Sequence, residues 1–327
     1  MTEKTVIQAL HDTLWAEMER DDRIVVMGED VGVRGGVFLA TDGFFERFGS
    51  ERVIDTPLAE GAIVGVAIGA AVAGLRPVAE MQFADFIYPA FDQIVSEAAR
   101  LRYRSRGAFS CPLVIRAPYG GGVHGGLHHS QCPENLFAQV PGLRVVAPST
   151  PADVAGLLRA SIQDPDPVVF FEHKRTYRSI RGEVPDDGYT VPIGKADVKR
   201  PGRDLTVITY GYMLHESLAA AETAAAEGID VEVLDLRTLA PLDREAILES
   251  VTRTHKVLIV HEANLTGGIG GEIAAIIADE AFESLDGPIL RVATPDIPAL
   301  PYVDSWEQHV LPNADNILAA IRRLAAY

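Results

Sequence analysis

Glu60 is a carboxylate in an unusual sequence context. It stands near the start of a segment that carries no further charge until Arg76. Thr56 followed by Pro57 is typical of a helix N-cap with proline at the first helical position, so we expect a helix from Pro57 to about Gly74. Glu60 would then lie in the first turn of an apolar helix.

Two roles for Glu60 are consistent with this context. Gly61, Gly65 and Gly69 recur every four residues on one helix face, and each costs roughly 0.5–1 kcal/mol relative to alanine, so they predict the close approach of another backbone. A carboxyl group at such a junction is desolvated, which raises its pKa and suits it to acid–base catalysis. A first-turn carboxylate is also stabilised by the helix dipole, by about 0.3–1 kcal/mol. The residues alone support both a catalytic acid and a helix-terminal charge.

A second candidate region is the segment APYGGGVHGGLHHSQCPE, residues 117–134, which follows a predicted strand. It places His124, His128 and His129 among several glycines. Loops at the carboxyl ends of strands bind ligands in open α/β folds, and histidine exchanges protons near neutral pH. We predict that at least one of these histidines donates or accepts a proton, the alternative being surface or hydrogen-bonded histidines without a chemical role.

Other ligand sites fit the sequence less well. His124, His128 and Cys132 are spaced by four, as zinc ligands on a helix would be, but so many glycines disfavour a helix here. A phosphate-binding P-loop needs a lysine after its glycines, and none follows. The later segment TGGIGGEIA has the wrong glycine spacing for a dinucleotide fingerprint, and we interpret it as the start of a helix.

Strand and helix patterns alternate through the whole chain. Ser149 or Thr150 before Pro151 indicates a helix start. Because each predicted strand is almost entirely apolar, we expect parallel sheets covered by helices on both faces. The strands are predicted at residues 23–30, 76–83, 112–118, 143–149, 167–173, 204–211, 230–239, 255–262 and 288–293, with C-terminal helices ending near 226 and at 243–251 and 270–282.

A stretch rich in proline, glycine and charge, residues 181–202, separates two such regions. We therefore predict an α/β fold of two domains with mostly parallel sheets. The predicted boundaries are residues 1–185 for the first domain, 186–203 for a linker and 204–327 for the second domain.

Composition excludes several classes of function. The net charge of −17 disfavours nucleic acid and anionic membrane surfaces as partners. Cys111 and Cys132 are the two cysteines, which gives no disulfide framework and favours a reducing compartment. The N-terminus has the period of an amphipathic helix rather than a signal peptide, and no uncharged run reaches the roughly 20 residues of a membrane span. We expect a cytoplasmic protein.

Taken together, five segments resemble the β subunit of the E1 component of 2-oxo acid dehydrogenases, which are thiamine-diphosphate enzymes related to transketolase. The resemblance covers essentially the whole chain and implies an N-terminal pyrimidine-binding domain and a C-terminal transketolase-type domain. One segment, QFADFIYPAFDQI, is more similar to branched-chain members than to pyruvate members. The five segments, in the family's order, are MGEDVGVRGGVF, DTPLAEGAIVGVAIG, EMQFADFIYPAFDQI, HHSQCPE and VLDLRTLAPLD.

The resemblance implies roles for individual residues. The glutamate of the T-P-x-x-E motif, here Glu60, hydrogen-bonds the ring nitrogen N1′ of the cofactor's aminopyrimidine and so favours deprotonation of the thiazolium C2. The histidine before S-Q, here His129, assists the substrate and the acyl transfer. Phe86 matches a position, often tyrosine, that stacks on the pyrimidine, while Leu58 and Gln82 match residues of the same pocket. The resemblance also places the glycine-rich helix at a subunit interface.

Members of this family carry a structural monovalent cation, for which K⁺ is our expectation, held largely by backbone carbonyls. The segments CPLV and SIQDPD match its binding segments. Asparagine is common at the last position, so an aspartate there would change the charge of the site. The implied ligands are Cys111, Leu113, Val114, Ser161, Asp164 and Asp166.

The resemblance also indicates what this chain lacks. The family's site for the diphosphate and Mg²⁺ is a G-D-G followed by asparagine on the α subunit, and this chain has no G-D-G. We therefore expect half of an active site, completed by an E1 α subunit in an α2β2 heterotetramer that decarboxylates a branched-chain 2-oxo acid and acylates the lipoyl group of E2. The alternatives are a pyruvate or acetoin dehydrogenase β subunit, a non-catalytic scaffolding subunit, and an NAD-binding protein. The last is disfavoured because no G-x-G-x-x-G follows the first strand.

Overall fold

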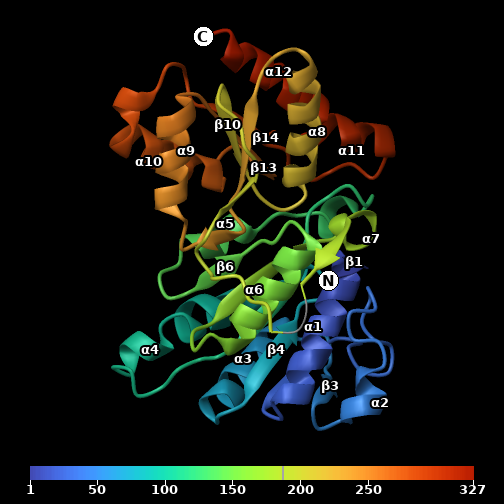
Figure 1. The fold of residues 1–327 in the computed structure, drawn as a ribbon. Coiled ribbons are helices and arrows are strands. Elements are labelled where there is room, and N and C mark those ends of the chain that lie inside the picture. Colours follow the sequence, from blue (N-terminus) through green and yellow to red (C-terminus); the bar gives the residue numbers. More distant parts are fainter. Residues whose placement is uncertain (186–187) are drawn as a thin grey trace. The chain divides into compact units, whose positions relative to one another are not determined.

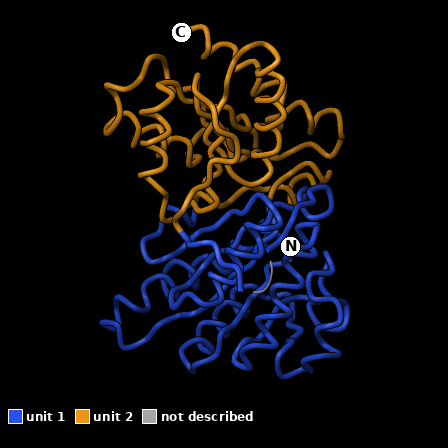
Figure 2. Tube along the Cα trace, viewed as in Figure 1, with its two compact units in different colours: residues 1–119, 136–193 blue, residues 120–135, 194–327 orange. Residues whose placement is uncertain are grey.

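The computed structural model describes residues 1–185 and 188–327. The chain divides into two compact units, coloured separately in Figure 2. Unit 1 comprises residues 1–119 and 136–193, and unit 2 comprises residues 120–135 and 194–327. Residues 186–187, at the predicted start of the linker, lie outside the described residues. The histidine-containing segment belongs to unit 2, although unit 1 flanks it on both sides in the sequence.

Unit 1 is built on a parallel sheet whose strands pair in the order β6-β7-β5-β4-β2-β3. A separate antiparallel pair joins β1 to β8. The strands are β1 (Thr2–Thr5), β2 (Ile24–Gly28), β3 (Val53–Asp55), β4 (Arg76–Glu80), β5 (Val114–Tyr119), β6 (Arg144–Val146), β7 (Val168–His173) and β8 (Arg181–Val184).

Helices cover both faces of this sheet. Helices α1 and α6 pack against each other and share a core with one set of alternate strand residues, including Val26 and Val78. The residues between them, such as Met27 and Ala79, point to the opposite face and are also buried, where α3 contacts β2 and β4. The helices are α1 (Val6–Arg20), α2 (Phe44–Phe48), α3 (Glu60–Val72), α4 (Leu101–Arg104), α6 (Pro151–Gln163) and α7 (Thr176–Ser179), with short turns η1 (Ala84–Phe86), η2 (Tyr88–Ala90) and η3 (Gln93–Ala98).

Unit 2 contains a second sheet in the order β14-β13-β10-β11-β9, parallel except for the edge strand β9. Helices α8 and α12 lie on one side of this sheet and α9 and α10 on the other (Figure 1). The strands are β9 (Asp197–Arg200), β10 (Leu205–Thr209), β11 (Val231–Asp235), β12 (Thr238–Ala240), β13 (Val257–Asn264) and β14 (Leu290–Thr294). The helices are η4 (Gly126–His128), α8 (Met213–Ala226), α9 (Arg244–Thr254), α10 (Ile269–Glu280), η5 (Phe282–Ser284), α11 (Asp304–Val310) and α12 (Ala314–Ala325), while α5 (Glu134–Ala138) contains the division between the units.

These elements confirm the predicted α/β class with mostly parallel sheets. All nine predicted strand segments contain a strand, and the helix starting at Pro151 is capped by the Thr150 side chain as expected. The sequence analysis did not predict β1, β3, β8 and β9, because these strands of three or four residues carry charged side chains and do not lie in a longer apolar run. Two of these, β8 and β9, lie in the stretch interpreted as linker. No helix among the described residues is long and apolar enough to cross a membrane.

Candidate active site

Helix α3 begins at Glu60 and not at Pro57, so the predicted start is wrong. Thr56 donates its backbone N–H to the carbonyl of Gly28 at 2.9 Å, which keeps the chain extended beyond β3. The carbonyl of Ala59 then accepts from Ala62 and Ile63 and opens the helix. Glu60 is therefore the first helical residue, where the N–H groups of the first turn favour negative charge.

Glu29 is a buried carboxylate next to this helix start, and the sequence analysis missed it. It follows the last residue of β2 and is only 4% exposed. Among the described residues, neither of its carboxylate oxygens has a hydrogen-bond partner. Burial raises the pKa of Glu29, and the charge of Glu60 raises it further. The charges of Glu29 and Glu60 therefore influence each other. The sequence did contain a signal for Glu29, because the acidic pair Glu29-Asp30 stands at the end of a predicted strand.

The glycines of α3 have different surroundings. A side chain at Gly61 would lie 3.0 Å from the carbonyl oxygen of Pro89, so the predicted close backbone approach is confirmed there within unit 1. At Gly65 the neighbour is the side chain of Gln93, at 3.2 Å. Gly69 has no described neighbour within 4 Å, and Val66 nearby is 63% exposed. One part of α3 thus packs within the unit, while an apolar strip remains open.

The other predicted cofactor residues lie in unit 1 with Glu60. Leu58 precedes α3 and is 79% exposed, which is unusual for a leucine. Gln82 is partly buried, and its side-chain nitrogen lies 3.5 Å from Oδ2 of Asp30. Phe86 ends η1 and contacts Phe83 edge-on, with ring centroids 5.7 Å apart. Gln82 is thus linked to the residue that follows Glu29.

His129 lies in unit 2, in the segment between β5 and α5. The segment is an irregular loop with one short turn at Gly126–His128, so its histidines do not lie on a helix. Among residues 1–185 and 188–327, no group of three or more histidine, cysteine and acidic side chains could hold a metal ion. His128 is exposed, whereas His129 is partly buried. His129 packs on Gly125, where an added Cβ would lie 2.7 Å from the Cβ of His129.

The two segments predicted to hold a cation lie side by side in unit 1. Cys111 donates its backbone N–H to the carbonyl of Pro165 at 3.1 Å, and Val114 pairs with Val168 across β5 and β7. Leu113 and Ser161 are buried, and the Ser161 hydroxyl donates to the carbonyl of Leu157. The carbonyls of Cys111, Leu113 and Ser161 already accept the backbone N–H groups of Leu113, Val168 and Asp164, so each has one lone pair left that could face an ion.

The carboxylates of the same segments are bound by arginines. Asp166 accepts from Nε of Arg102 at 2.5 Å, and Asp164 forms an ion pair with Arg144 at 2.7 Å. Burial raises the pKa of Cys111 to about 12, so its thiol stays protonated at neutral pH. Asp166, found where asparagine is common, is thus paired with an arginine of this chain.

Comparison with known proteins identifies the fold and the family. Residues 2–179 match the family model of the transketolase pyrimidine-binding domain, and residues 194–317 match that of the transketolase C-terminal domain. A solved structure described as split gene transketolase, inactive β4 tetramer, has the same fold, with a TM-score of 0.80, 24% identity and 98% of each chain covered. The 2-oxoisovalerate dehydrogenase subunit beta of Bacillus subtilis (strain 168) is 58% identical over all 327 residues, covering 100% of both chains. The chain belongs to the 2-oxo acid dehydrogenase E1 β subunits.

A second relative is nearly as similar to this chain in sequence as the first. The pyruvate dehydrogenase E1 component subunit beta of Bacillus subtilis (strain 168) is 49% identical over 327 residues, again covering 100% of both chains. The pyrimidine-binding match includes both Glu60 and His129. Both residues therefore lie within the range matched by one family model, although Glu60 belongs to unit 1 and His129 to unit 2.

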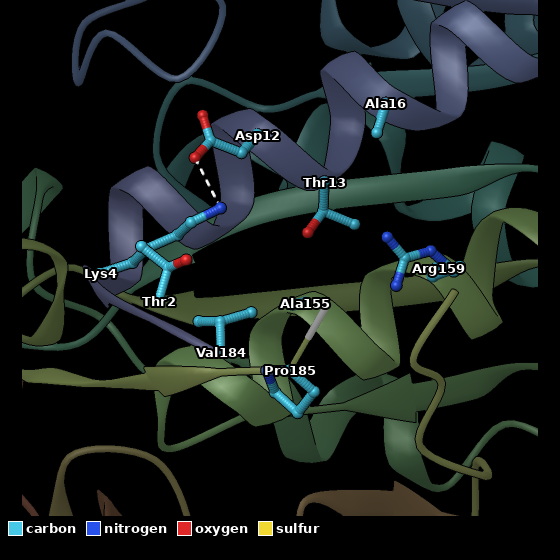
Figure 3. A pocket seen from close by; sticks show the side chains of 9 residues that line it. All are labelled: Thr2, Lys4, Asp12, Thr13, Ala16, Ala155, Arg159, Val184 and Pro185. Carbon is cyan, nitrogen blue, oxygen red and sulfur yellow. Dashed lines mark ion pairs between the residues drawn. The ribbon is translucent and has the colours of Figure 1, made fainter. Parts of the chain in front are cut away.

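Two cavities of the β subunit lie apart from these residues. The cavity in unit 1 has a volume of about 280 Å³, and its Lys4 and Asp12 form an ion pair of 2.8 Å across its wall (Figure 3). Neither cavity is lined by a predicted site residue. The first is lined by Thr2, Lys4, Asp12, Thr13, Ala16, Ala155, Arg159, Val184 and Pro185, and the second, of about 660 Å³ in unit 2, by Val198, Pro201, Gly202, Arg203, Asp230, Glu232 and Arg253.

Proposed function

We propose that this chain is the β subunit of a thiamine-diphosphate-dependent branched-chain 2-oxo acid dehydrogenase E1. The complete enzyme decarboxylates the 2-oxo acid oxidatively and transfers the acyl group to the lipoyl group of E2. The observation that carries the proposal is the pair of acids at the start of α3, where Glu60 adjoins the buried, unpartnered carboxylate of Glu29. An acid on the protein surface would have neither the burial of Glu29 nor a second carboxylate, such as Glu60, acting on it.

These acids suit the aminopyrimidine end of the cofactor. When bound, thiamine diphosphate supplies the nucleophilic carbon that attacks the 2-oxo group and accepts the electron pair left by loss of carbon dioxide. Glu60 holds or releases a proton at the ring nitrogen N1′, which is general acid–base chemistry. Glu29 adds a second, buried carboxylate that has no hydrogen-bond partner among the described residues and is therefore open to a ligand. Phe86, Leu58 and Gln82 surround the same ring.

His129 is proposed to act on the substrate and the acyl group. Its partial burial and its contact with Gly125 restrict where its imidazole can point. Histidine side chains can act as proton donors or acceptors, the chemistry proposed here. His128, exposed to solvent on the same loop, lacks that restriction and serves as the natural comparison.

The cofactor's diphosphate and Mg²⁺ are proposed to bind an E1 α subunit. Those groups are strongly charged, whereas this chain has a net charge of −17 and its described residues form no cluster of three or more metal-ligating side chains. We therefore propose an α2β2 heterotetramer with two active sites, each completed by both kinds of subunit. The exposed apolar strip of α3, including Val66, supports a subunit contact at that helix.

A structural K⁺ is proposed between the segments 111–114 and 161–166. Backbone carbonyls would hold the ion, since Arg102 and Arg144 already bind the carboxylates of Asp166 and Asp164. The ion would join the start of β5 to the loop before β7. A cytoplasmic location is also part of the proposal, supported by two cysteines that are both thiols.

The preference for branched-chain substrates is supported by identity of 58% with the 2-oxoisovalerate dehydrogenase subunit against 49% with the pyruvate dehydrogenase subunit. Steady-state turnover of the reconstituted α2β2 complex with 3-methyl-2-oxobutanoate and with pyruvate tests the preference. We expect a higher kcat/KM for 3-methyl-2-oxobutanoate. A higher value for pyruvate would favour the pyruvate dehydrogenase alternative, and no turnover with either would favour a scaffolding subunit.

A further inference from the structure

The loop that carries His129 is held by a buried glutamate from the C-terminal part of the chain. Glu307 lies in α11 and is 1% exposed. Its Oε1 accepts the backbone N–H of Gly122 at 3.0 Å, and its Oε2 accepts the backbone N–H of His124 at 3.2 Å. Nδ1 of His124 lies 2.9 Å from the same Oε2. One carboxylate thus binds two backbone amides and one imidazole of the loop.

A second carboxylate holds the base of the same loop. Glu262, in β13 and 6% exposed, accepts the backbone N–H of Gly121 at 2.5 Å and lies 3.5 Å from the sulfur of Cys132. Gly120 donates to the carbonyl of Gln131 at 3.1 Å, which closes the loop on itself. Glu262 therefore contacts both ends of the loop, at Gly121 and Cys132. Glu307 holds the residues that follow the first end, Gly122 and His124.

His124 and Gly125 connect the part of the loop held by Glu307 to His129. His124 has a φ of +57°, a left-handed conformation that histidine rarely adopts and that must be held by its surroundings. The next residue, Gly125, lies against His129, and an added Cβ there would lie 2.6 Å from the carbonyl oxygen of His129. A shift of His124 therefore moves the surface on which His129 rests.

The burial of Glu307 explains why His124 is needed. A carboxylate taken out of water requires hydrogen bonds and an opposite charge, or its desolvation is not compensated. The two backbone amides supply hydrogen bonds, and the imidazole of His124 approaches the same carboxylate at 2.9 Å. Asp304, at the start of α11, lies 3.7 Å from Nε2 of His124 and is exposed, so it is the more weakly placed of the two acids.

We propose that Glu307 is a positioning residue for His129 and that His124 is a side-chain partner of Glu307 rather than a participant in the chemistry. This inference rests on the proposed function of His129. It gives α11 the role of positioning a residue of the proposed active site. It also separates the three histidines of the loop: His129 is proposed to react, His124 contacts Glu307, and His128 has neither role.

A double-mutant cycle in the reconstituted α2β2 complex tests this inference. The variants are Glu307→Gln, His129→Ala and the two together, each assayed for kcat and KM with 3-methyl-2-oxobutanoate and an acylatable lipoyl domain. We expect Glu307→Gln to lower kcat about tenfold to a hundredfold, the range for a misplaced catalytic group, with KM changed less than about twofold. In the His129→Ala background the same substitution should change kcat less than about twofold.

Asp304→Asn is the matched control, because it removes an exposed carboxylate from the same helix and the same histidine. It should change kcat less than about twofold. If Glu307→Gln does not assemble with the α subunit, His124→Asn replaces it in the cycle with the same expectation, since it removes the imidazole contact and leaves the carboxylate.

The outcomes separate the two levels of the proposal. If His129→Ala lowers kcat but Glu307→Gln lowers it equally in both backgrounds, the positioning role is wrong while the function of His129 stands. A Glu307→Gln variant with normal kcat would overturn the positioning role as well. If His129→Ala has normal turnover, the proposed function of His129 fails, and the positioning role fails with it.

Discussion

Glu29 and Glu307 are both almost fully buried, yet their surroundings differ. Glu307, in unit 2, binds two backbone amides and the imidazole of His124. Glu29, in unit 1, has no described hydrogen-bond partner on either oxygen and is repelled by Glu60. A buried carboxylate with a full set of partners holds structure together, whereas one without partners costs stability unless it is protonated or meets a ligand. The difference indicates which acid serves architecture and which serves binding.

The same contrast distinguishes the two candidate regions. The carboxylate of Glu29, near α3, has no hydrogen-bond partner among the described residues, as expected where a cofactor and a second subunit complete the site. The histidine loop is instead anchored by carboxylates of its own unit. We infer that the first region is unfinished in the isolated chain and that the second is largely preformed.

The largest expected effect is at Glu60. Glu60→Gln cannot exchange a proton with the ring nitrogen, so turnover of the reconstituted complex should fall about a thousandfold, within the 10²–10⁴ range of general acid–base catalysis. Circular dichroism and assembly with the α subunit should be unchanged. If Glu60 only stabilises the helix dipole, turnover would stay near normal and stability would fall by about 1 kcal/mol or less.

A smaller loss is expected at His129. Removing its imidazole in His129→Ala should lower lipoyl acylation about a hundredfold. His128→Ala is the matched control, because His128 is adjacent and exposed, and it should retain at least about half of the activity. Equal losses in the two variants would remove the basis for assigning the chemistry to His129.

Glu134 sharpens the comparison because only one of its oxygens has a partner. Tyr210 donates to Oε1 at 2.7 Å, whereas Oε2 has no hydrogen-bond partner among the described residues. Burial raises the pKa of Glu134 to about 7. The folded state therefore binds a proton that the unfolded state has lost between about pH 4.5 and 7, so Glu134 costs stability as the pH rises through this window.

Glu134→Gln should remove that pH dependence. Relative to the parent chain, the variant should gain up to about 3 kcal/mol between pH 4.5 and pH 8, from roughly 1.4 kcal/mol per pKa unit. Urea unfolding at several pH values measures the difference. A constant difference between the two proteins across this range would show that Glu134 does not titrate there.

The smallest expected effect is on the free energy of unfolding when Glu29 or Glu307 is replaced. Because Glu29 has no partner to lose, Glu29→Gln should leave the free energy of unfolding at pH 8 unchanged or raise it by about 1 kcal/mol. Glu307→Gln should lower it by about 1–3 kcal/mol, because a partnered buried group is disrupted. Urea unfolding of both variants measures this, and a larger loss at Glu29 than at Glu307 would reverse the comparison.

Much of the fold could be predicted because it depends on strong local patterns. Apolar runs such as residues 167–173 and the Thr150-Pro151 helix start need no distant partner to be recognised. The start of α3 could not be predicted, because Thr56 is held by a backbone hydrogen bond to Gly28, far away in the sequence. Glu60 and His129 were identified by motif. Glu307 was missed because its burial and its partners exist only in the folded chain. Glu29 was missed because its burial exists only there, although the acidic pair Glu29-Asp30 at the end of a predicted strand was a signal.

The glycines illustrate the same limit. A row at every fourth position predicts contact but cannot say with what, and Gly61, Gly65 and Gly69 meet a backbone, a side chain and no described neighbour, respectively. In TGGIGGEIA, Gly268 and Gly270 lie against the buried ring of His261, which explains the glycines without a nucleotide. Long-range packing therefore decides what a local motif means.

The central claim is that this chain holds the aminopyrimidine end of thiamine diphosphate and depends on a partner for the diphosphate end. Titration calorimetry of the purified chain with thiamine diphosphate and Mg²⁺, repeated after addition of the α subunit, tests it most directly. We predict weak or no binding by the chain alone and tight, magnesium-dependent binding by the α2β2 complex. Micromolar, magnesium-dependent binding by the isolated chain would contradict the division of the site between two subunits.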